Sequence, residues 1–132
     1  MEALFIKGDE KTPFFKFDPN GTLEIYGRSW PEDVLEAYQP ALDWYAEYKK
    51  NPAPTTKVIF KIEYFNTSSS KIIYDLLADL DEFKKQGYNV EVEWYYEEDD
   101  PDMLDVGETY QDIFPDLGIK TIPVEEFEYT VV

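Results

Sequence analysis

The stretch that most constrains the fold runs from residue 58 to residue 77, where a strand pattern passes without a linker into a helical pattern. Residues 58–65 (VIFKIEYF) are mostly apolar, residues 67–70 are Thr-Ser-Ser-Ser, and apolar residues at helical spacing begin at Ile72. A strand that leads directly into a helix indicates an α/β fold. The junction also places four hydroxyl groups at a helix N-terminus, where they can cap free backbone N–H groups or carry an anion such as phosphate.

Strand and helix patterns alternate along most of the chain. A hairpin is expected first, because residues 19–21 (Pro-Asn-Gly) form a turn signal between two short strand patterns. Pro123 indicates that the last strand lies at an edge of the sheet, since proline has no backbone N–H to donate to a neighbouring strand. The expected elements are strands at 14–18 and 22–27, a helix at 32–50, a strand at 56–65, a helix at 68–86, a strand around 90–94, a helix at 102–114 and a strand at 119–127.

This order, β-β-α-β-α-β-α-β, predicts an α/β fold in which a mixed sheet of about five strands is packed by three helices through right-handed crossovers. The length favours one domain over residues 1–132. Ser29 and Glu32 resemble a capping box at the start of the first helix, and Pro40 should kink or split that helix. In the strand at 56–65, alternation places on one face Val58, Phe60, Ile62 and Tyr64, and on the other face Ile59 and Phe65.

The charge of the chain restricts its partners. The formal net charge is -17, and Arg28 is the only arginine among 12 basic residues. Nucleic acids and anionic membranes are bound through Lys and Arg, so neither is expected as a partner. An acidic surface of this kind can instead steer a basic protein partner.

Several residue types are missing from the sequence. The absence of cysteine and histidine removes disulfides, thiolate nucleophiles, the commonest general base and the commonest metal ligands. No glycine-rich phosphate loop or nucleophile elbow occurs, so we expect neither catalysis nor a cofactor. The N-terminal residues lack the pattern of a signal peptide and no apolar run approaches membrane-spanning length, so a cytoplasmic protein is expected.

Two candidate sites have both a structural and a functional interpretation. The hydroxyl cluster can simply cap a helix, although one cap needs one hydroxyl, and Lys71 in the first turn is favourable only beside an anion. The acidic residues at 97–105 can be a solvated face, a divalent-metal site or a docking surface for a basic partner; they are Glu97, Glu98, Asp99, Asp100, Asp102 and Asp105.

Four separated blocks resemble the SiaC family of bacterial regulatory phosphoproteins, in the same order along the chain. The blocks are residues 12–18 (TPFFKFD), 21–29 (GTLEIYGRS), 63–71 (EYFNTSSSK) and 94–100 (WYYEEDD). The expected topology also resembles the STAS-like fold of anti-sigma-factor antagonists. Those proteins are phosphorylated on a Ser or Thr where a strand meets a helix.

The resemblance implies a partner-switching protein that is controlled by phosphorylation. A dedicated serine/threonine kinase would phosphorylate Thr67, with Ser68, Ser69 and Ser70 as alternatives, and a PP2C-type phosphatase would remove the phosphate. The unphosphorylated form would bind and activate a diguanylate cyclase, raising cyclic-di-GMP and favouring aggregation or biofilm. The residues expected to bind partners are Arg28, Asn66, Thr67, Ser68, Ser69, Lys71, Tyr96, Glu97, Glu98 and Asp99.

Overall fold

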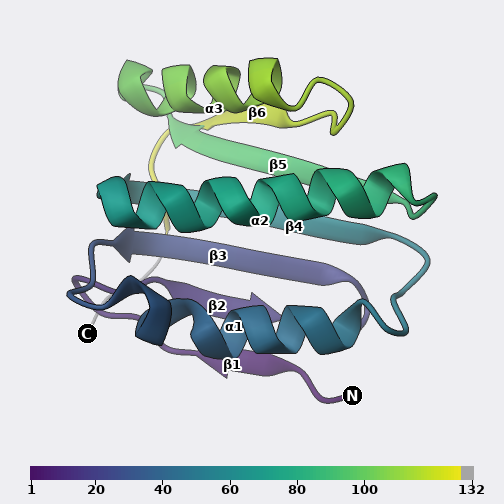
Figure 1. Ribbon diagram of the computed structural model, residues 1–132. Helices are drawn as coiled ribbons and strands as arrows, with labels where there is room; N and C mark the ends of the chain where they lie inside the picture. Colours follow the sequence, from purple (N-terminus) through teal and green to yellow (C-terminus); the bar gives the residue numbers. More distant parts are fainter. Residues whose placement is uncertain (129–132) are drawn as a thin grey trace.

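The computed structural model describes residues 1–128, which form one mixed sheet with three helices (Figure 1). The strands follow one another across the sheet in chain order, from β1 at one edge to β6 at the other. In chain order the elements are β1 (Leu4–Ile6), β2 (Phe14–Phe17), β3 (Thr22–Ser29), α1 (Val34–Tyr48), β4 (Thr56–Phe65), α2 (Thr67–Lys85), β5 (Val90–Glu97), α3 (Pro101–Ile113) and β6 (Lys120–Val124).

The sheet is antiparallel at one end and parallel at the other. Strands β1, β2 and β3 pair antiparallel, and β3, β4, β5 and β6 pair parallel. The predicted hairpin joins β2 to β3, where the Gly21 N–H donates to the Asp18 carbonyl at 3.0 Å. Gly21 has a φ of 109°, a conformation that residues with a Cβ rarely adopt, so glycine closes this turn.

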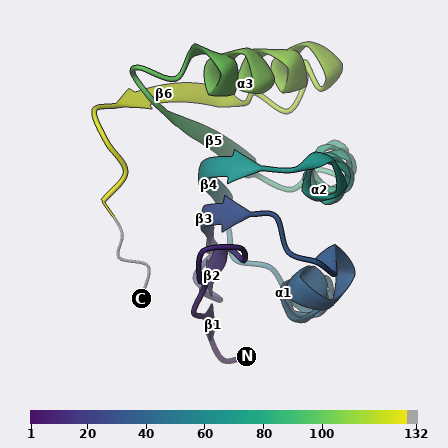
Figure 2. The same ribbon diagram turned by 90° about the vertical axis from the view of Figure 1, so that its left-hand side faces the viewer.

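The three helices cover the same face of the sheet, and within residues 1–128 the opposite face carries no helix (Figure 2). The helices pack their apolar stripes on this face, where one cluster of buried side chains forms the core. Aromatic rings supply much of its volume, because Trp94, Tyr38, Tyr48, Phe15 and Phe60 are fully buried. No helix within residues 1–128 is long and apolar enough to cross a bilayer.

The element order predicted from the sequence is confirmed except at the N-terminus. The sheet has six strands in the described residues, not five, because Leu4–Ile6 adds an antiparallel strand beside β2. Three residues carry too little alternation to be recognised as a strand. The edge position predicted from Pro123 is confirmed, since β6 is the last strand of the order.

The predicted start of the first helix is wrong. Helix α1 is capped by Asp33, whose carboxylate accepts from the Glu36 N–H at 3.1 Å. Ser29, the expected cap, is instead the last residue of β3 and is fully buried. Pro40 does not split α1, which is one helix from Val34 to Tyr48.

A bulge in the pairing of β3 with β4 changes which side chains face the core. Gly27 pairs with Ile62 and Arg28 pairs with Tyr64, so β4 has one extra residue at this point. Tyr64, predicted on the apolar face, is 53% exposed. Phe65, predicted on the opposite face, packs edge-on against the buried Trp94 ring at 6.2 Å between centroids. Ile59, on the face opposite Val58, is also buried, so β4 is partly covered on both faces.

Helix α3 is fitted to the sheet through Trp94. The Trp94 Nε1–H donates to the Met103 carbonyl at 3.0 Å, and Gly107 lies over the indole ring. A Cβ added at Gly107 would lie 2.6 Å from Trp94 Cδ1 and 3.0 Å from the Cγ2 atom of Thr121. The side chain of any other residue would therefore push α3 away from β5 and β6.

The close approach at Gly107 predicts that Gly107→Ala is destabilising. An alanine inside a helix normally gains up to about 1 kcal/mol over glycine, but the clash with Trp94 should reverse the sign and cost about 1–3 kcal/mol. Urea unfolding followed by tryptophan fluorescence measures the difference. Glu108→Ala, at the next and exposed position of α3, is the matched control and should unfold like the wild type. A Gly107→Ala protein as stable as the control would contradict the packing of α3 described here.

Candidate functional site

The N-termini of the three helices all lie at the same end of the strands, beside the carboxyl ends of the parallel strands (Figure 1). This arrangement follows from the connections, because each helix runs back between two parallel strands. The caps are Asp33 on α1, Asn66 on α2 and Asp100 on α3. Ligand sites in open α/β sheets form at this end of the strands, which we call the carboxyl edge.

Asn66 caps α2, and the hydroxyl cluster does not. The Asn66 Oδ1 accepts from the Ser69 N–H at 3.0 Å and from the Ser68 hydroxyl at 3.2 Å. The interpretation of the hydroxyl cluster as the helix cap is therefore wrong: Thr67 is the first residue of α2. Its side chain is exposed, and its hydroxyl makes no hydrogen bond within residues 1–128.

The three serines that follow Thr67 are all engaged. Ser68 donates to the cap, as described, and the Ser70 hydroxyl donates to the Thr67 carbonyl at 2.7 Å. Ser69 is fully buried, and its hydroxyl accepts from the hydroxyl of Ser29 at 2.8 Å. The four hydroxyls, which look equivalent in the sequence, therefore occupy four different environments.

The start of α2 differs in charge from the starts of α1 and α3. Two carboxylates lie at the start of α1 (Asp33 and Glu36) and two at the start of α3 (Asp100 and Asp102). In contrast, the cap of α2 is a neutral amide, and no acidic residue lies in its first turn. The partial positive charge of this helix end is therefore not offset by a carboxylate of its own first turn.

The two cations expected at the site, Arg28 on β3 and Lys71 on α2, are each paired with a carboxylate. The Arg28 guanidinium holds Glu63 on the neighbouring strand through Nη2–Oε1 at 3.1 Å and Nε–Oε2 at 3.3 Å. Lys71 Nζ lies 3.9 Å from the Asp75 carboxylate on the exposed side of α2. No hydrogen bond joins either cation to Thr67 in the described residues.

Two of the acidic residues at 97–105 have structural roles. Asp100 caps α3 by accepting from the Met103 N–H at 3.2 Å, and Glu97 accepts from the Phe127 N–H at 3.0 Å. The exposed carboxylates are those of Glu98, Asp99, Asp102 and Asp105. No group of three or more acidic side chains within residues 1–128 is placed to hold a metal ion.

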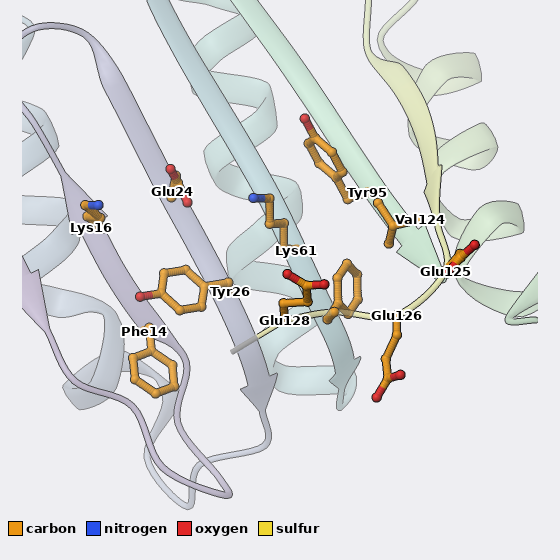
Figure 3. A pocket seen from close by; sticks show the side chains of 11 residues that line it. Phe14, Lys16, Glu24, Tyr26, Lys61, Tyr95, Val124, Glu125, Glu126 and Glu128 are labelled. Atoms are coloured by element: carbon orange, nitrogen blue, oxygen red, sulfur yellow. The ribbon is translucent and has the colours of Figure 1, made fainter. Parts of the chain in front are cut away.

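The helix-free face of the sheet holds a groove that sequence reasoning missed. Its volume is about 690 Å³, and its floor comes from neighbouring strands while residues 124–128 cross over it (Figure 3). Lys61 lies 5.0 Å from the centroid of the Tyr95 ring, and Phe14 stacks on Tyr26 at 4.8 Å. Burial and the neighbouring Glu93 raise the pKa of Tyr95. The signal in the sequence was the alternation of strands β2 to β5, which places Lys and Tyr on the face away from the core.

Nine of the ten residues expected to bind partners form two neighbouring groups, and the tenth, Arg28, lies on β3. Asn66, Thr67, Ser68, Ser69 and Lys71 belong to the cap and first turns of α2, which follows β4. The second group lies at the end of β5 and in the turn after it, and consists of Tyr96, Glu97, Glu98 and Asp99. Because β4 and β5 are parallel neighbours, both groups lie at the carboxyl edge. Of these residues, Ser69 is buried and Tyr96 is half-buried against the core.

Comparison with known proteins gives consistent matches. A relative, an uncharacterized protein of Pseudomonas aeruginosa (strain UCBPP-PA14), is 27% identical over 113 residues, which is 85% of this chain and 90% of that protein. The structure of SiaC of Pseudomonas aeruginosa matches with a TM-score of 0.85 at 25% identity, covering 94% of this chain and 100% of that one. The structure of apo-SiaC from Pseudomonas aeruginosa matches with a TM-score of 0.84 at 26% identity, covering 92% and 99%.

A third structure contains the same fold in a complex. It is the diguanylate cyclase SiaD with its activator SiaC from Pseudomonas aeruginosa, and it matches with a TM-score of 0.86 at 24% identity, covering 92% of this chain and 99% of that chain. The model of the SiaC family, described as SiaC family regulatory phosphoprotein, matches residues 6–124. The chain therefore belongs to the SiaC family of regulatory phosphoproteins.

Proposed function

We propose that this protein is a non-catalytic switch in which phosphorylation of Thr67 controls binding of a diguanylate cyclase. A dedicated serine/threonine kinase adds the phosphate, and a PP2C-type phosphatase removes it. The unphosphorylated form binds and activates the cyclase, which raises cyclic-di-GMP and favours aggregation or biofilm. The site of action is the cytoplasm, where the kinase has ATP. The observation that carries the proposal is that Thr67 alone, among the four hydroxyl residues, is exposed and makes no hydrogen bond within residues 1–128.

Accessibility supports Thr67 over the three serines. A kinase must bring the acceptor hydroxyl in line with a phosphoryl group, so the hydroxyl has to be reachable and free to turn. Ser69 is fully buried, and Ser70 is half-buried with its hydroxyl on a carbonyl. Ser68 is exposed but donates to Asn66, and that hydrogen bond would have to break first.

The charge at the start of α2 supports a phosphate at this position. A phosphate on Thr67 would add about 1.5 to 2 negative charges at the first residue of a helix, where the dipole and free N–H groups favour an anion. No first-turn carboxylate of α2 competes for those groups. The folded protein should therefore accept the phosphate at little cost.

A partner built against the unmodified surface would respond differently. SiaC of Pseudomonas aeruginosa is named as the activator of the diguanylate cyclase SiaD in the structure of their complex, and we propose a cyclase of this class as the partner here. We place the contact at the carboxyl edge, on the exposed residues around Thr67 and the turn after β5. Burying two negative charges in such a contact costs several kcal/mol, and about 3 kcal/mol already weakens binding more than a hundredfold.

The first prediction from this proposal concerns the residue that accepts the phosphate. Thr67→Ala should abolish phosphorylation by the kinase and should leave stability within about 0.5 kcal/mol of wild type, because no hydrogen bond is lost. Intact-mass measurement after co-expression with the kinase detects one phosphate on the wild type, and fragmentation locates it. Ser68→Ala is the matched control and should still be phosphorylated. A phosphate found on Ser68, Ser69 or Ser70 of the wild type would refute the assignment to Thr67.

The second prediction concerns the mechanism of the switch. The phosphoprotein should melt within a few degrees of the unmodified protein but bind the cyclase at least a hundredfold more weakly. Thr67→Asp should reproduce only part of the loss, because it carries one charge on a shorter side chain. Thermal melts and titrations of the three proteins against the cyclase provide the measurement. A much lower melting temperature of the phosphoprotein, or amide shifts across the whole sheet, would mean that phosphorylation acts by refolding.

A further inference from the structure

Three buried hydroxyl groups form a hydrogen-bonded chain under the first turn of α2. The Ser29 hydroxyl lies 2.7 Å from the Tyr38 hydroxyl and donates to the Ser69 hydroxyl at 2.8 Å. Ser29 and Ser69 are fully buried and Tyr38 is 1% exposed. These hydrogen bonds join the end of β3 to α1 and to α2.

The direction of the hydrogen bonds follows from the number of protons. Ser29 has one hydroxyl proton and gives it to Ser69, so the Tyr38 hydroxyl must donate to Ser29. Burial raises the pKa of Tyr38 to about 12, which keeps this phenol protonated and able to donate at neutral pH. Each hydroxyl therefore needs its neighbour, and removal of Ser29 leaves both of the others without this partner.

Ser29 also holds the start of α2 through its backbone. The Asn66 N–H donates to the Ser29 carbonyl at 3.0 Å. Ser29 thus fixes α2 at residue 66 through its main chain and at residue 69 through its side chain. Thr67 and Ser68 lie between these two points, so Ser29 contacts α2 on both sides of Thr67.

We propose, building on the switch at Thr67, that Ser29 is a positioning residue that selects which hydroxyl of the cluster is phosphorylated. Its side chain binds the Ser69 hydroxyl in the interior, and its two bonds to α2 hold Thr67 outward for the kinase and the phosphatase. Ser69 belongs to the buried stripe of α2 with Ile72 and Ile73, and Ser29 supplies the hydrogen bond that holds its hydroxyl there.

Loss of the Ser29 hydroxyl should therefore change the choice of site and not only the stability. In Ser29→Ala the Ser69 hydroxyl loses its donor, and the first turn of α2 is held by Asn66 alone. The kinase would then meet a less ordered set of hydroxyls. Misplacement of an acceptor by about 1 Å can lower the rate of transfer by up to a hundredfold.

The chain provides a matched control at the other end of β4. The Tyr48 hydroxyl lies 2.8 Å from the hydroxyl of Thr56, which is 1% exposed and is the first residue of β4. Thr56→Val removes a buried hydroxyl partner of an α1 tyrosine, as Ser29→Ala does, but far along β4 from Asn66. The Tyr48 hydroxyl keeps the Ala53 N–H as a second partner at 3.1 Å, so this control loses one hydrogen bond where Ser29→Ala loses two. Loss of stability alone should not change the phosphorylated residue in either variant.

The experiment phosphorylates full-length wild type, Ser29→Ala and Thr56→Val with the kinase that modifies the wild type. Fragmentation locates each phosphate, and initial rates give kcat and KM. We expect one phosphate on Thr67 in wild type and Thr56→Val. In Ser29→Ala we expect an about tenfold lower kcat/KM at Thr67, mostly in kcat, and a detectable fraction of phosphate on a serine of residues 68–70. Equal sites and equal rates in Ser29→Ala and Thr56→Val would overturn the proposal.

Hydrogen exchange separates this inference from the proposed function. The amides of Ser69 and Ser70 should exchange at least tenfold faster in Ser29→Ala than in Thr56→Val, with or without a kinase. If exchange is unchanged, Ser29 does not position the turn, and the inference fails while phosphorylation of Thr67 can still hold. If the wild type is phosphorylated elsewhere or not at all, the proposed function and the selection of Thr67 both fail, whatever the exchange shows.

Discussion

The parallel pairing of β4 with β3 on one side and β5 on the other determines where a site can form in this protein. Parallel neighbours require crossover connections, and here those connections are helices on a single face. Each helix must begin where its preceding strand ends, so three helix N-termini gather at one edge. Two of them already carry carboxylates in the cap and first turn, and α2 does not. The N-terminus of α2 therefore has no carboxylate in its cap or first turn to offset the helix dipole, and the hydroxyl cluster follows its cap.

The bulge between β3 and β4 controls how that helix end is approached. The extra residue in β4 turns Tyr64 outward and brings Phe65 onto the core side against Trp94. Without the bulge, the alternation would continue unchanged, and Phe65 would point to the open face. The anchoring of Phe65 brings Asn66 beside Ser29, whose carbonyl accepts the Asn66 N–H. The shift of one residue in the ladder is thus connected directly to the position of the first turn of α2.

The sequence predicted the elements that have strong hydrophobic periodicity. It did not predict the features that depend on tertiary contacts. Helix α2 was predicted within one residue at each end, because its apolar stripe is regular and Gly87 follows it. Strand β1 is too short to show a pattern, and the bulge has no local signal that alternation can detect. The capping role expected of Ser29 belonged to Asp33, because Ser29 completes β3 and forms buried hydrogen bonds to residues 9 and 40 positions away.

The candidate site shows the same division. The sequence indicated the segment 66–71 as a candidate, but it left four adjacent hydroxyls unranked, since their burial and hydrogen bonds distinguish them and that of Ser69 reaches β3. The sequence left the roles of the acidic residues at 97–105 open, because tertiary structure decides that Asp100 caps α3 and that Glu97 accepts from the Phe127 N–H, 30 residues away. The close approach of Gly107 to Trp94 was also invisible, because glycine gives no pattern.

The charge of the chain determines how a partner could detect a phosphate on Thr67. A phosphate adds about two charges to a protein whose net charge is already -17, so the long-range field changes little in proportion. At physiological ionic strength, exposed charges are screened beyond about 8 Å. A partner must therefore detect the modification by direct contact with residue 67. Direct contact works as a discriminator only if that residue projects in one fixed direction, which an exposed threonine on a firmly anchored helix turn can provide.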